Sequence, residues 1–190
     1  VYEGFGEMLF THFGVSGPLI LSASCHADFE AHPEGFVLHL DLKPAMTQEE
    51  LERRLEREFA LQPRKELRNA LKALLPERLA LISAQLFVAS LENPSAEGGA
   101  DRPVYTLNEK ELRLLAAFLK DLTMTVIGTR GFAEAIVTKG GVNVKEINPS
   151  TMESKFVKGL YFIGEVLDLD AVTGGFNLQI AWSTAYAAGN

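Results

Sequence analysis

Cysteine, long apolar runs and an excess of basic charge are scarce or absent in this 190-residue sequence. The single cysteine, Cys25, excludes an internal disulfide and fits a reducing compartment, so we expect a cytoplasmic protein. No apolar run approaches the ~18 residues that a membrane span needs, and we expect no membrane contact. No secretory signal peptide, internal repeat or heptad array is visible. Nothing in the residue spacing predicts a metal site.

Basic residues are outnumbered, with 18 Lys and Arg against 25 Asp and Glu and a formal net charge of −7. Binding to phosphate backbones needs a basic face, so we expect no nucleic-acid partner. The basic residues cluster in the run Glu52–Glu58, ERRLERE, where acidic residues are interleaved. Because the net charge of this run is near zero, we interpret it as the solvated face of a helix. The pairs Glu49–Arg53 and Glu50–Arg54 are expected to support that face.

Alternating apolar and polar residues predict strands on both sides of a helical region. The segments predicted as strands, or as strand-rich, are Val1–Phe13, Gly35–Lys43, Leu122–Val126 and Glu134–Thr138. A turn over Gly14–Pro18 is expected to lead into an apolar helix from Leu19, with Ser16 as its N-cap. A second interpretation places Ser16 and the Gly17 N–H beside a ligand.

Four amphipathic helices between these strands are predicted to bury their apolar stripes together as a small bundle. Capping boxes at Thr47–Glu50 and Thr106–Glu109 predict the starts of the first and fourth helices, and Pro63 and Pro76 those of the second and third. The side chains expected to face inward are Leu51, Leu55, Phe59, Leu67, Ala70, Leu71, Leu74, Leu79, Ile82, Leu86, Leu112, Leu115, Ala116 and Leu119. Asn93–Pro103 is a loop by composition.

The richest functional pattern lies in Gly159–Ala188. Leu160–Ile163 is apolar on both faces, which predicts a strand buried in a parallel sheet. A short acidic loop, Val166–Val172, then leads to a glycine pair and a helix of small residues from Phe176. Strand, glycine turn and helix N-terminus together favour an anion or cofactor site. The alternative is an ordinary βα unit whose glycines serve only the turn.

Several single residues carry two interpretations each. His12 is a candidate acid–base group, but its phenylalanine neighbours favour a structural role. Cys25 is expected to be inert, and Trp182 is predicted to be a core anchor rather than a flavin-stacking residue. The turn Lys139–Val142 either lets backbone approach a ligand or forms a plain hairpin or bulge.

Four stretches resemble one known family. They are GLYFIGEVLDLDAVTGGFNLQ from Gly159, GEMLFTHFGVSGP from Gly6, TKGGV from Thr138 and EINPSTMESK from Glu146. They span the chain in the order found in the YhiN/BaiN-like family of bacterial FAD-dependent oxidoreductases. The chain is therefore similar to that family from end to end.

This resemblance implies a set of cofactor contacts. Gly164 and Glu165 would lie against the ribityl–phosphate side of FAD. The residues Thr173, Gly174, Gly175, Phe176 and Asn177 would line its isoalloxazine and pyrophosphate side through backbone N–H groups. FAD would carry the hydride chemistry. No catalytic residue is predicted.

One departure from the family concerns the Rossmann fingerprint G-x-G-x-x-G, which is absent from this sequence. We therefore expect the later part of a longer flavoprotein. The predicted fold is α+β: a mixed or antiparallel, barrel-like sheet subdomain (1–45 and 120–154), an inserted helical bundle (46–119) and a C-terminal βα segment of a Rossmann-type FAD-binding domain (155–190).

Two functions follow as expectations. The first is part of an FAD-dependent oxidoreductase, covering the flavin and a small-molecule substrate, with a nicotinamide electron donor. The second is a non-catalytic substrate-covering or interaction domain that binds no cofactor by itself. Under either one, the chain alone is expected to lack FAD and to be inactive.

Overall fold

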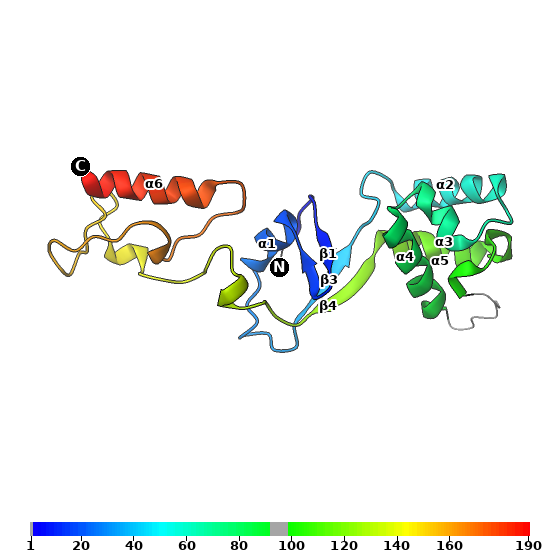
Figure 1. Cartoon of the computed structure of the whole chain (residues 1–190), viewed down its shortest axis with the longest axis horizontal. Helices are drawn as coiled ribbons and strands as arrows, with labels where there is room; N and C mark the ends of the chain where they lie inside the picture. The colour runs from blue at the N-terminus through cyan, green and yellow to red at the C-terminus, as the bar shows by residue number, and fades with distance from the viewer. Residues whose placement is uncertain (1, 92–98) are drawn as a thin grey trace. The chain divides into compact units, whose positions relative to one another are not determined.

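The computed structural model describes residues 2–91 and 99–190, and it mixes short strands with helices (Figure 1). The strands are β1 (Leu9–Thr11), β2 (Gly14–Ser16), β3 (Phe36–Leu40) and β4 (Leu122–Val126). The helices are α1 (Pro18–Ser24), α2 (Gln48–Leu61), α3 (Leu67–Ala70), α4 (Glu77–Ser90), α5 (Glu109–Lys120) and α6 (Phe176–Gly189). Short 3-10 turns are η1 (Leu71–Ala73), η2 (Gly99–Asp101), η3 (Val104–Thr106), η4 (Phe132–Glu134), η5 (Val144–Glu146) and η6 (Gly164–Val166). The predicted α+β class is confirmed.

The chain divides into two compact units. One combines Val1–Phe36 with Val126–Asn190, and the other, the helical unit, is Val37–Thr125. The three-part division expected from the sequence, with its boundaries near residues 45, 119 and 154, stays a prediction.

The N-terminal segment forms an antiparallel hairpin followed by a short helix. β1 pairs with β2 in the register Leu9↔Ser16 to Thr11↔Gly14, so part of the predicted turn is a strand. Ser16 is not the N-cap of α1, because Gly17 occupies that position with φ 99°. Its backbone lies so close to Glu7 and Met8 that a Cβ would stand 3.0 Å from the Met8 Cα. Only glycine fits this approach and conformation.

β3 and β4 pair where the chain enters and leaves the helical unit. The Leu42 N–H donates to the Leu119 carbonyl at 3.0 Å, which extends the pairing past the strand ends. In both strands, burial alternates as predicted, with Leu40 and Leu122 buried and His39 and Thr123 exposed. The predicted periodicity of two is confirmed for both.

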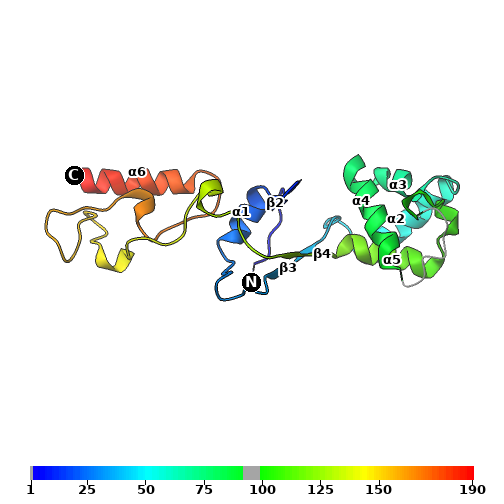
Figure 2. The ribbon, with the colours of Figure 1, turned by 60° about the horizontal axis from the view of Figure 1, so that its bottom comes forward.

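The helical unit gathers α2 to α5 around one apolar core, as Figures 1 and 2 show. The fully buried large side chains at its centre are Phe87, Leu51, Leu55, Leu67, Leu71, Leu115 and Leu119. The predicted capping box of α2 is confirmed: the Glu50 N–H donates to the Thr47 hydroxyl, and the Thr47 N–H donates to the Glu50 carboxylate at 2.8 Å. The predicted stripes of α2, of α3 with η1, and of α5 all face this core.

Three helix predictions were wrong in detail. The second helix begins at Leu67 rather than near Pro63, because the 62–66 segment forms turns instead. The capping box of α5 uses Asn108 and Glu111 rather than Thr106 and Glu109, since Thr106 lies in η3. The α4 face was also misassigned: Ile82 and Leu86 are about half exposed, at 48% and 47%. α4 buries Ala80, Ser83, Ala84, Phe87 and Val88 instead.

Two predicted strands do not form within the described residues. Glu134–Thr138 contains the end of η4 and no strand. Leu160–Ile163 contributes only one isolated bridge, Glu153↔Tyr161, and three of its side chains are more than 40% exposed. A strand exists only through partners on its edges. Leu160–Ile163 pairs briefly with residues 152–154, because the Ser154 N–H donates to the Leu160 carbonyl and the Phe162 N–H to the Met152 carbonyl, but neither predicted strand joins a sheet in this part of the chain. Most of the predicted Asn93–Pro103 loop lies outside the described residues.

Across residues 2–91 and 99–190, none of the helices has both the length and the apolar content that crossing a membrane requires.

Candidate functional site

The candidate cofactor segment is built on α6 and on η6, which packs against the middle of that helix. The Gly164 N–H donates to the Thr184 hydroxyl at 3.0 Å, and a Cβ on Gly164 would stand 3.6 Å from the Ala181 Cβ. The small residues noted in the sequence allow this close approach, because Ala and Thr leave room for the η6 backbone. Gly164 has φ 67°, which favours glycine at the start of the turn.

The loop between η6 and α6 is fastened at both of its ends. The Val142 N–H donates to the Val166 carbonyl at 2.8 Å, and the Asp168 N–H donates back to Val142 at 2.9 Å. At the other end, the Asn177 side-chain amide accepts from the Ala171 N–H and donates to the Ala171 carbonyl, both at 2.8 Å. Asn177 therefore uses its amide to close the loop, so any ligand contact from this residue would come from its backbone.

The first turn of α6 follows the predicted glycine pair. Gly174 and Gly175 have φ 115° and 89°, and Gly175 is the N-cap. The first helical bond runs from the Gln179 N–H to the Gly175 carbonyl at 3.1 Å. The amides of residues 176–178 thus have no acceptor within the helix, as at any helix start. Nothing within 4 Å would meet a Cβ on Gly175, so the space above this turn is open.

The predicted cofactor residues fall into two groups along one helix. Gly164 and Glu165 lie beside the middle of α6, whereas Thr173–Asn177 lie at its start. Eight helical residues separate Phe176 from Thr184, which corresponds to about 12 Å along the axis. An extended dinucleotide is long enough to reach both groups. That these residues hold FAD stays a prediction.

Glu165 and the outer face of α6 have no partners in the described part of the chain. The Glu165 side chain is exposed, and it forms no ion pair or hydrogen bond with the residues that the structure describes. Leu178, Trp182 and Tyr186, spaced by four, are all more than half exposed. The prediction that Trp182 is a core anchor was therefore wrong for this chain, because α6 packs through its small residues and turns its large ones outward.

The Lys139–Val142 turn brings backbone against backbone. Gly141 has φ 144°, and a Cβ there would lie 2.5 Å from the Val166 carbonyl oxygen. The backbone at Gly141 thus lies close to the η6 segment of the protein itself, whereas one interpretation of the sequence placed it close to a ligand. The neighbouring Lys139 ammonium donates to the Cys25 carbonyl at 3.1 Å.

Cys25 lies beside Asp170. Burial, followed by the Asp170 charge and its hydrogen bond, raises the pKa of the Cys25 thiol. A raised pKa keeps the sulfur protonated at neutral pH and agrees with the prediction of an inert cysteine.

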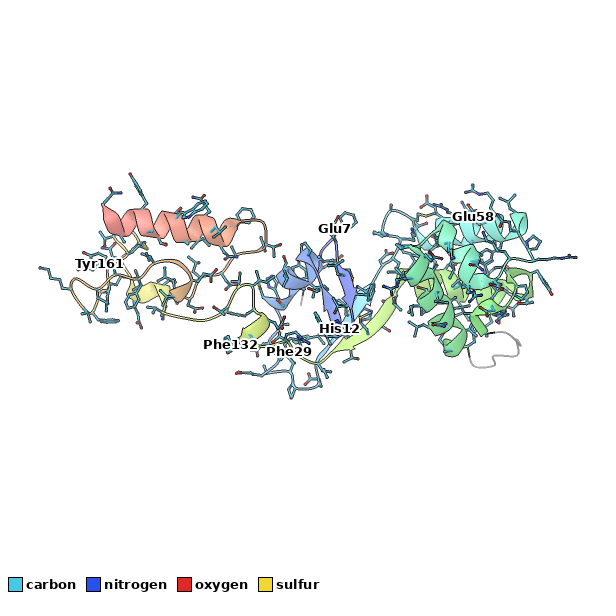
Figure 3. The ribbon with its side chains drawn as sticks, in the orientation of Figure 1. Glu7, His12, Phe29, Glu58, Phe132 and Tyr161 are labelled. Atoms are coloured by element: carbon cyan, nitrogen blue, oxygen red, sulfur yellow. The ribbon has the colours of Figure 1, made fainter. Side chains whose placement is uncertain are left out.

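His12, the candidate acid–base group of the sequence analysis, is exposed, and so is His39. His12 lies in the turn between β1 and β2, with its ring edge-on to Phe13 (Figure 3). The His39 Nδ1 lies 2.8 Å from an Asp121 carboxylate oxygen on the surface of the helical unit. No group of three or more metal-ligating side chains converges in residues 2–91 and 99–190.

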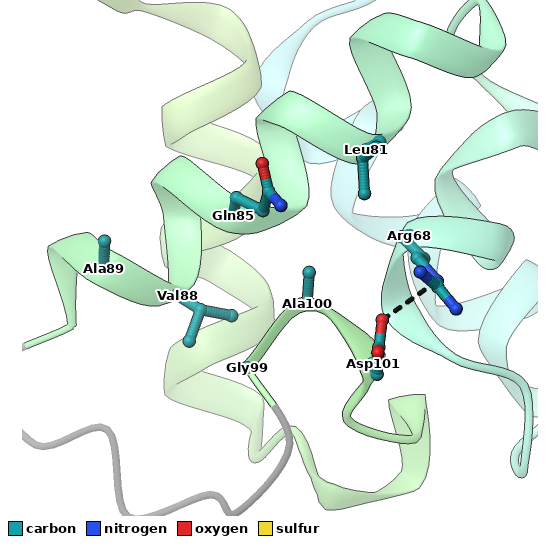
Figure 4. A pocket seen from close by; sticks show the side chains of 8 residues that line it. All are labelled: Arg68, Leu81, Gln85, Val88, Ala89, Gly99, Ala100 and Asp101. Carbon is teal, nitrogen blue, oxygen red and sulfur yellow. Dashed lines mark ion pairs between the residues drawn. The ribbon is translucent and has the colours of Figure 1, made fainter.

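Two hollows mark the helical unit. The first, of about 440 Å³, is largely apolar and lies beside α4 (Figure 4). Its one cation, Arg68, is neutralised by Asp101 at 2.9 Å and by Glu66 at 3.0 Å. The second, of about 380 Å³, is lined by Ala45, Met46, Glu50, Arg53, Arg54 and Arg57. Sequence reasoning passed over this second hollow because the net charge of its run is near zero.

Comparisons with known proteins agree with this architecture. Residues 1–137 match the family model described as HI0933-like protein barrel and H2TH domain. The chain is 34% identical over 183 residues to a ribosomal RNA dihydrouridine synthase of Haemophilus influenzae and 37% identical over 181 residues to one of Escherichia coli. It is 30% identical over 188 residues to a 3-dehydro-bile acid delta(4,6)-reductase of Clostridium scindens.

These matches cover 96%, 95% and 98% of this chain but only 41%, 41% and 44% of the three relatives. The chain thus spans less than half the length of the curated relatives it matches. The family model covers most of the chain, and its barrel agrees with the predicted sheet subdomain. The resemblance noted in the sequence is confirmed, and the chain belongs to the HI0933-like (YhiN/BaiN) family of FAD-dependent oxidoreductases.

Proposed function

We propose that this chain is part of an FAD-dependent oxidoreductase and covers the flavin and substrate side of its active site. The observation that carries the proposal is the start of α6, where backbone amides without helical acceptors follow the Gly174–Gly175 pair and the space beside Gly175 is open. A helix start of this kind favours anionic groups such as a pyrophosphate. The match to a family of FAD-dependent oxidoreductases supports the same cofactor.

The residues present fit FAD in two respects. Gly175 leaves no side chain between the ligand and the backbone, whereas a Cβ on Gly174 would lie 3.5 Å from the Phe176 ring. The exposed Glu165 carboxylate, which forms no ion pair or hydrogen bond with residues 2–91 and 99–190, can accept hydrogen bonds from ribityl hydroxyls. When bound, FAD supplies hydride transfer, and the residues of this chain bind and orient it.

We further propose that the reaction is a reduction. The relative from Clostridium scindens is named a reductase, which supports this direction. A small-molecule substrate and a nicotinamide electron donor complete the proposal. The outward stripe of Leu178, Trp182 and Tyr186 supports a further point, that another part of the full-length protein covers α6.

The first test concerns the 190-residue chain alone. We expect it to bind FAD weakly or not at all, because it carries no G-x-G-x-x-G segment to hold the pyrophosphate from the other side. Isothermal titration calorimetry with FAD measures this directly. Micromolar or tighter binding by the isolated chain would show that its residues suffice, contrary to the proposal.

The second test concerns Glu165 in the full-length protein. A hydrogen bond to a charged group contributes roughly 1.5–3 kcal/mol, so Glu165→Ala should weaken FAD binding by about ten- to a hundredfold. Glu146→Ala is the matched control, since Glu146 is also exposed and its side chain forms no hydrogen bond or ion pair in the described part of the chain. Equal FAD retention in both variants would remove Glu165 from the proposed site.

A further inference from the structure

Asn177 is the second residue of α6, and its side chain folds back onto the loop before the helix. Asn supports a helix less well than Ala, because its short amide can bond to nearby backbone instead. Here the amide oxygen accepts from the Ala171 N–H, and the amide nitrogen donates to the Ala171 carbonyl, both at 2.8 Å. The side chain therefore pairs with Ala171 through one donor and one acceptor, as the backbone of a neighbouring strand does.

The two hydrogen bonds close a ring around the glycine pair that precedes α6. The ring runs from residue 171 to residue 177 and contains Gly174 and Gly175, both at positive φ. Glycine loses more conformational freedom on folding than any other residue, so a stretch with two glycines is costly to order. Within residues 2–91 and 99–190, no hydrogen bond reaches the backbone of Val172–Gly174. The Asn177 amide is thus the contact that fixes where this stretch begins.

The same face of α6 holds the other end of the loop. Asn177 and Thr184 are seven residues apart, which is two helical turns, so both side chains leave the helix on one side, about 10 Å apart along its axis. The Thr184 hydroxyl accepts from the Gly164 N–H at 3.0 Å. One helix therefore positions both groups of predicted cofactor residues, the η6 group through Thr184 and the glycine pair through Asn177.

The pairing with Ala171 depends on the chemistry of residue 177 rather than on its size. Leu matches Asn in shape but carries no polar atom, so it cannot bond to Ala171. Asp would keep the acceptor for the Ala171 N–H, but its second oxygen would face the Ala171 carbonyl without a proton between them. An isosteric change from Asn to Leu therefore removes both hydrogen bonds while it preserves the volume of the side chain.

We infer that Asn177 is a positioning residue of the proposed FAD site. Its amide holds the 172–175 stretch in one conformation, so that the backbone N–H groups of the helix start are in place before FAD binds. This inference rests on the proposed function, because it takes FAD to bind at this helix start. A segment that is ordered in advance loses less conformational entropy when the ligand binds. A loop that adopts the competent conformation only part of the time weakens the apparent affinity by that fraction.

The test uses the full-length protein, from which flavin is removed and to which FAD is titrated back. Asn177→Leu and Asn177→Ala both lack the amide, and only the first keeps the size of the side chain. Asn148→Leu is the matched control, since it removes an amide that also bonds to backbone, the Ser150 N–H at 3.0 Å, but outside the ring. For each protein we measure the dissociation constant of FAD, the melting temperature of the apo-protein and the hydrogen–deuterium exchange of the peptide over residues 169–178.

We expect both Asn177 variants to bind FAD about tenfold more weakly than wild type, because their loop is competent for only about a tenth of the time. The 169–178 peptide should exchange faster in their apo-proteins, since the Ala171 N–H has lost its acceptor. Asn148→Leu should bind FAD as wild type does. The three variants should have melting temperatures close to one another, because each loses only exposed or half-buried hydrogen bonds.

Equal FAD affinity of wild type and Asn177→Leu would remove the positioning role and leave the proposed function in place, whatever the melting temperatures. Weaker FAD binding without faster exchange in the apo-protein would also overturn the inference, because the amide would then act on FAD directly. A wild-type protein that holds no FAD would contradict the proposed function, and the positioning role with it.

Discussion

At the scale of single residues, the helical unit is fixed by one ion pair in its interior. Arg102 and Glu111 are only 3% and 14% exposed, and the two guanidinium Nη atoms lie 3.1 and 3.2 Å from the carboxylate oxygens. Arg102 also donates to the Thr106 carbonyl at 3.0 Å. The same carboxylate accepts from the Asn108 N–H in the capping box. One acidic side chain therefore links the η3 segment to the start of α5.

The stability of the protein should depend on pH through the Arg102–Glu111 ion pair. Burial raises the pKa of Glu111, but the Asn108 hydrogen bond and the Arg102 charge together lower it below the ordinary 4.5. The contribution of Glu111 is therefore complete above its unfolded pKa and is lost as the pH falls through the lower folded pKa. At pH 7, Glu111→Gln should cost about 3 kcal/mol, as for a broken buried pair.

The measurement is urea unfolding of wild type and variant from pH 7 down to pH 3. The difference in free energy of unfolding between wild type and Glu111→Gln should shrink below about pH 4. Glu77→Gln, at an exposed ion pair with Lys72, is the control and should change stability little at any pH. A Glu111→Gln difference that stays constant over the whole pH range would rule out a charged Glu111 as the cause.

Adjacent glycines in the 139–142 turn should respond differently to substitution. Gly140 and Gly141 both have positive φ, 95° and 144°, so alanine strains either one by about 1–3 kcal/mol. Only at Gly141 would the new Cβ also meet a backbone oxygen, that of Val166. Gly141→Ala should therefore lower the melting temperature clearly more than Gly140→Ala. Equal shifts would mean that the backbone contact is dispensable.

At the scale of elements, α4 shows why the buried face of a helix is hard to predict when apolar residues lie on nearly every side of it. Leu79, Ile82 and Leu86 form an acceptable inward stripe in the sequence. The structure instead buries a face of small residues around Phe87, because α3 and η2 approach α4 closely there. Small residues permit short distances between elements, and packing rather than side-chain size selects the buried face.

Neighbouring residues of α4 test that assignment. Phe87 is 1% exposed and Leu86 is 47% exposed. Phe87→Ala should cost about 3–5 kcal/mol through the cavity it leaves. Leu86→Ala should cost under about 1 kcal/mol, because little apolar area returns to water. Chemical denaturation gives the free energy of unfolding of both variants. A larger loss of stability for Leu86→Ala than for Phe87→Ala would show that the face of α4 carrying Leu86 is the buried one.

At the scale of the whole molecule, α6 packs one side against η6 and exposes the other side to solvent. Its small residues contact η6, and its large residues face outward. An apolar stripe of this kind commonly marks an interface. In the proposed full-length flavoprotein, that interface is with the remainder of the FAD-binding domain.

The sole tryptophan of the chain, Trp182, makes this testable. At 66% exposure, it should emit at long wavelength and be quenched efficiently by acrylamide in the 190-residue chain. In the full-length protein, the fluorescence of Trp182 is obtained as the difference between wild type and Trp182→Phe. We expect this emission to lie at shorter wavelength and to be shielded from acrylamide. The same emission and quenching in both proteins would show that α6 stays uncovered.

Local patterns were sufficient for much of the fold. The alternation in β3 and β4, the capping box at Thr47 and the stripes of α2 and α5 follow from backbone periodicity and nearest-neighbour hydrogen bonds, which a sequence displays directly. The glycine pair before α6 was visible for the same reason, since positive φ is a property of the residue itself.

Other features depend on what lies across space. Leu160–Ile163 has the composition of a buried strand but joins no sheet in the described chain, and Trp182 has the character of a core residue but faces outward. The Nε of Arg54, buried without a hydrogen-bond partner in the described chain, likewise depends on residues outside α2, such as Met46. The sequence by itself determined that four segments of the helical unit become helices, and to which family the chain belongs. Only the tertiary structure decided which faces are buried and which charges stay without a partner, because burial and pairing are set by neighbours that are distant along the chain.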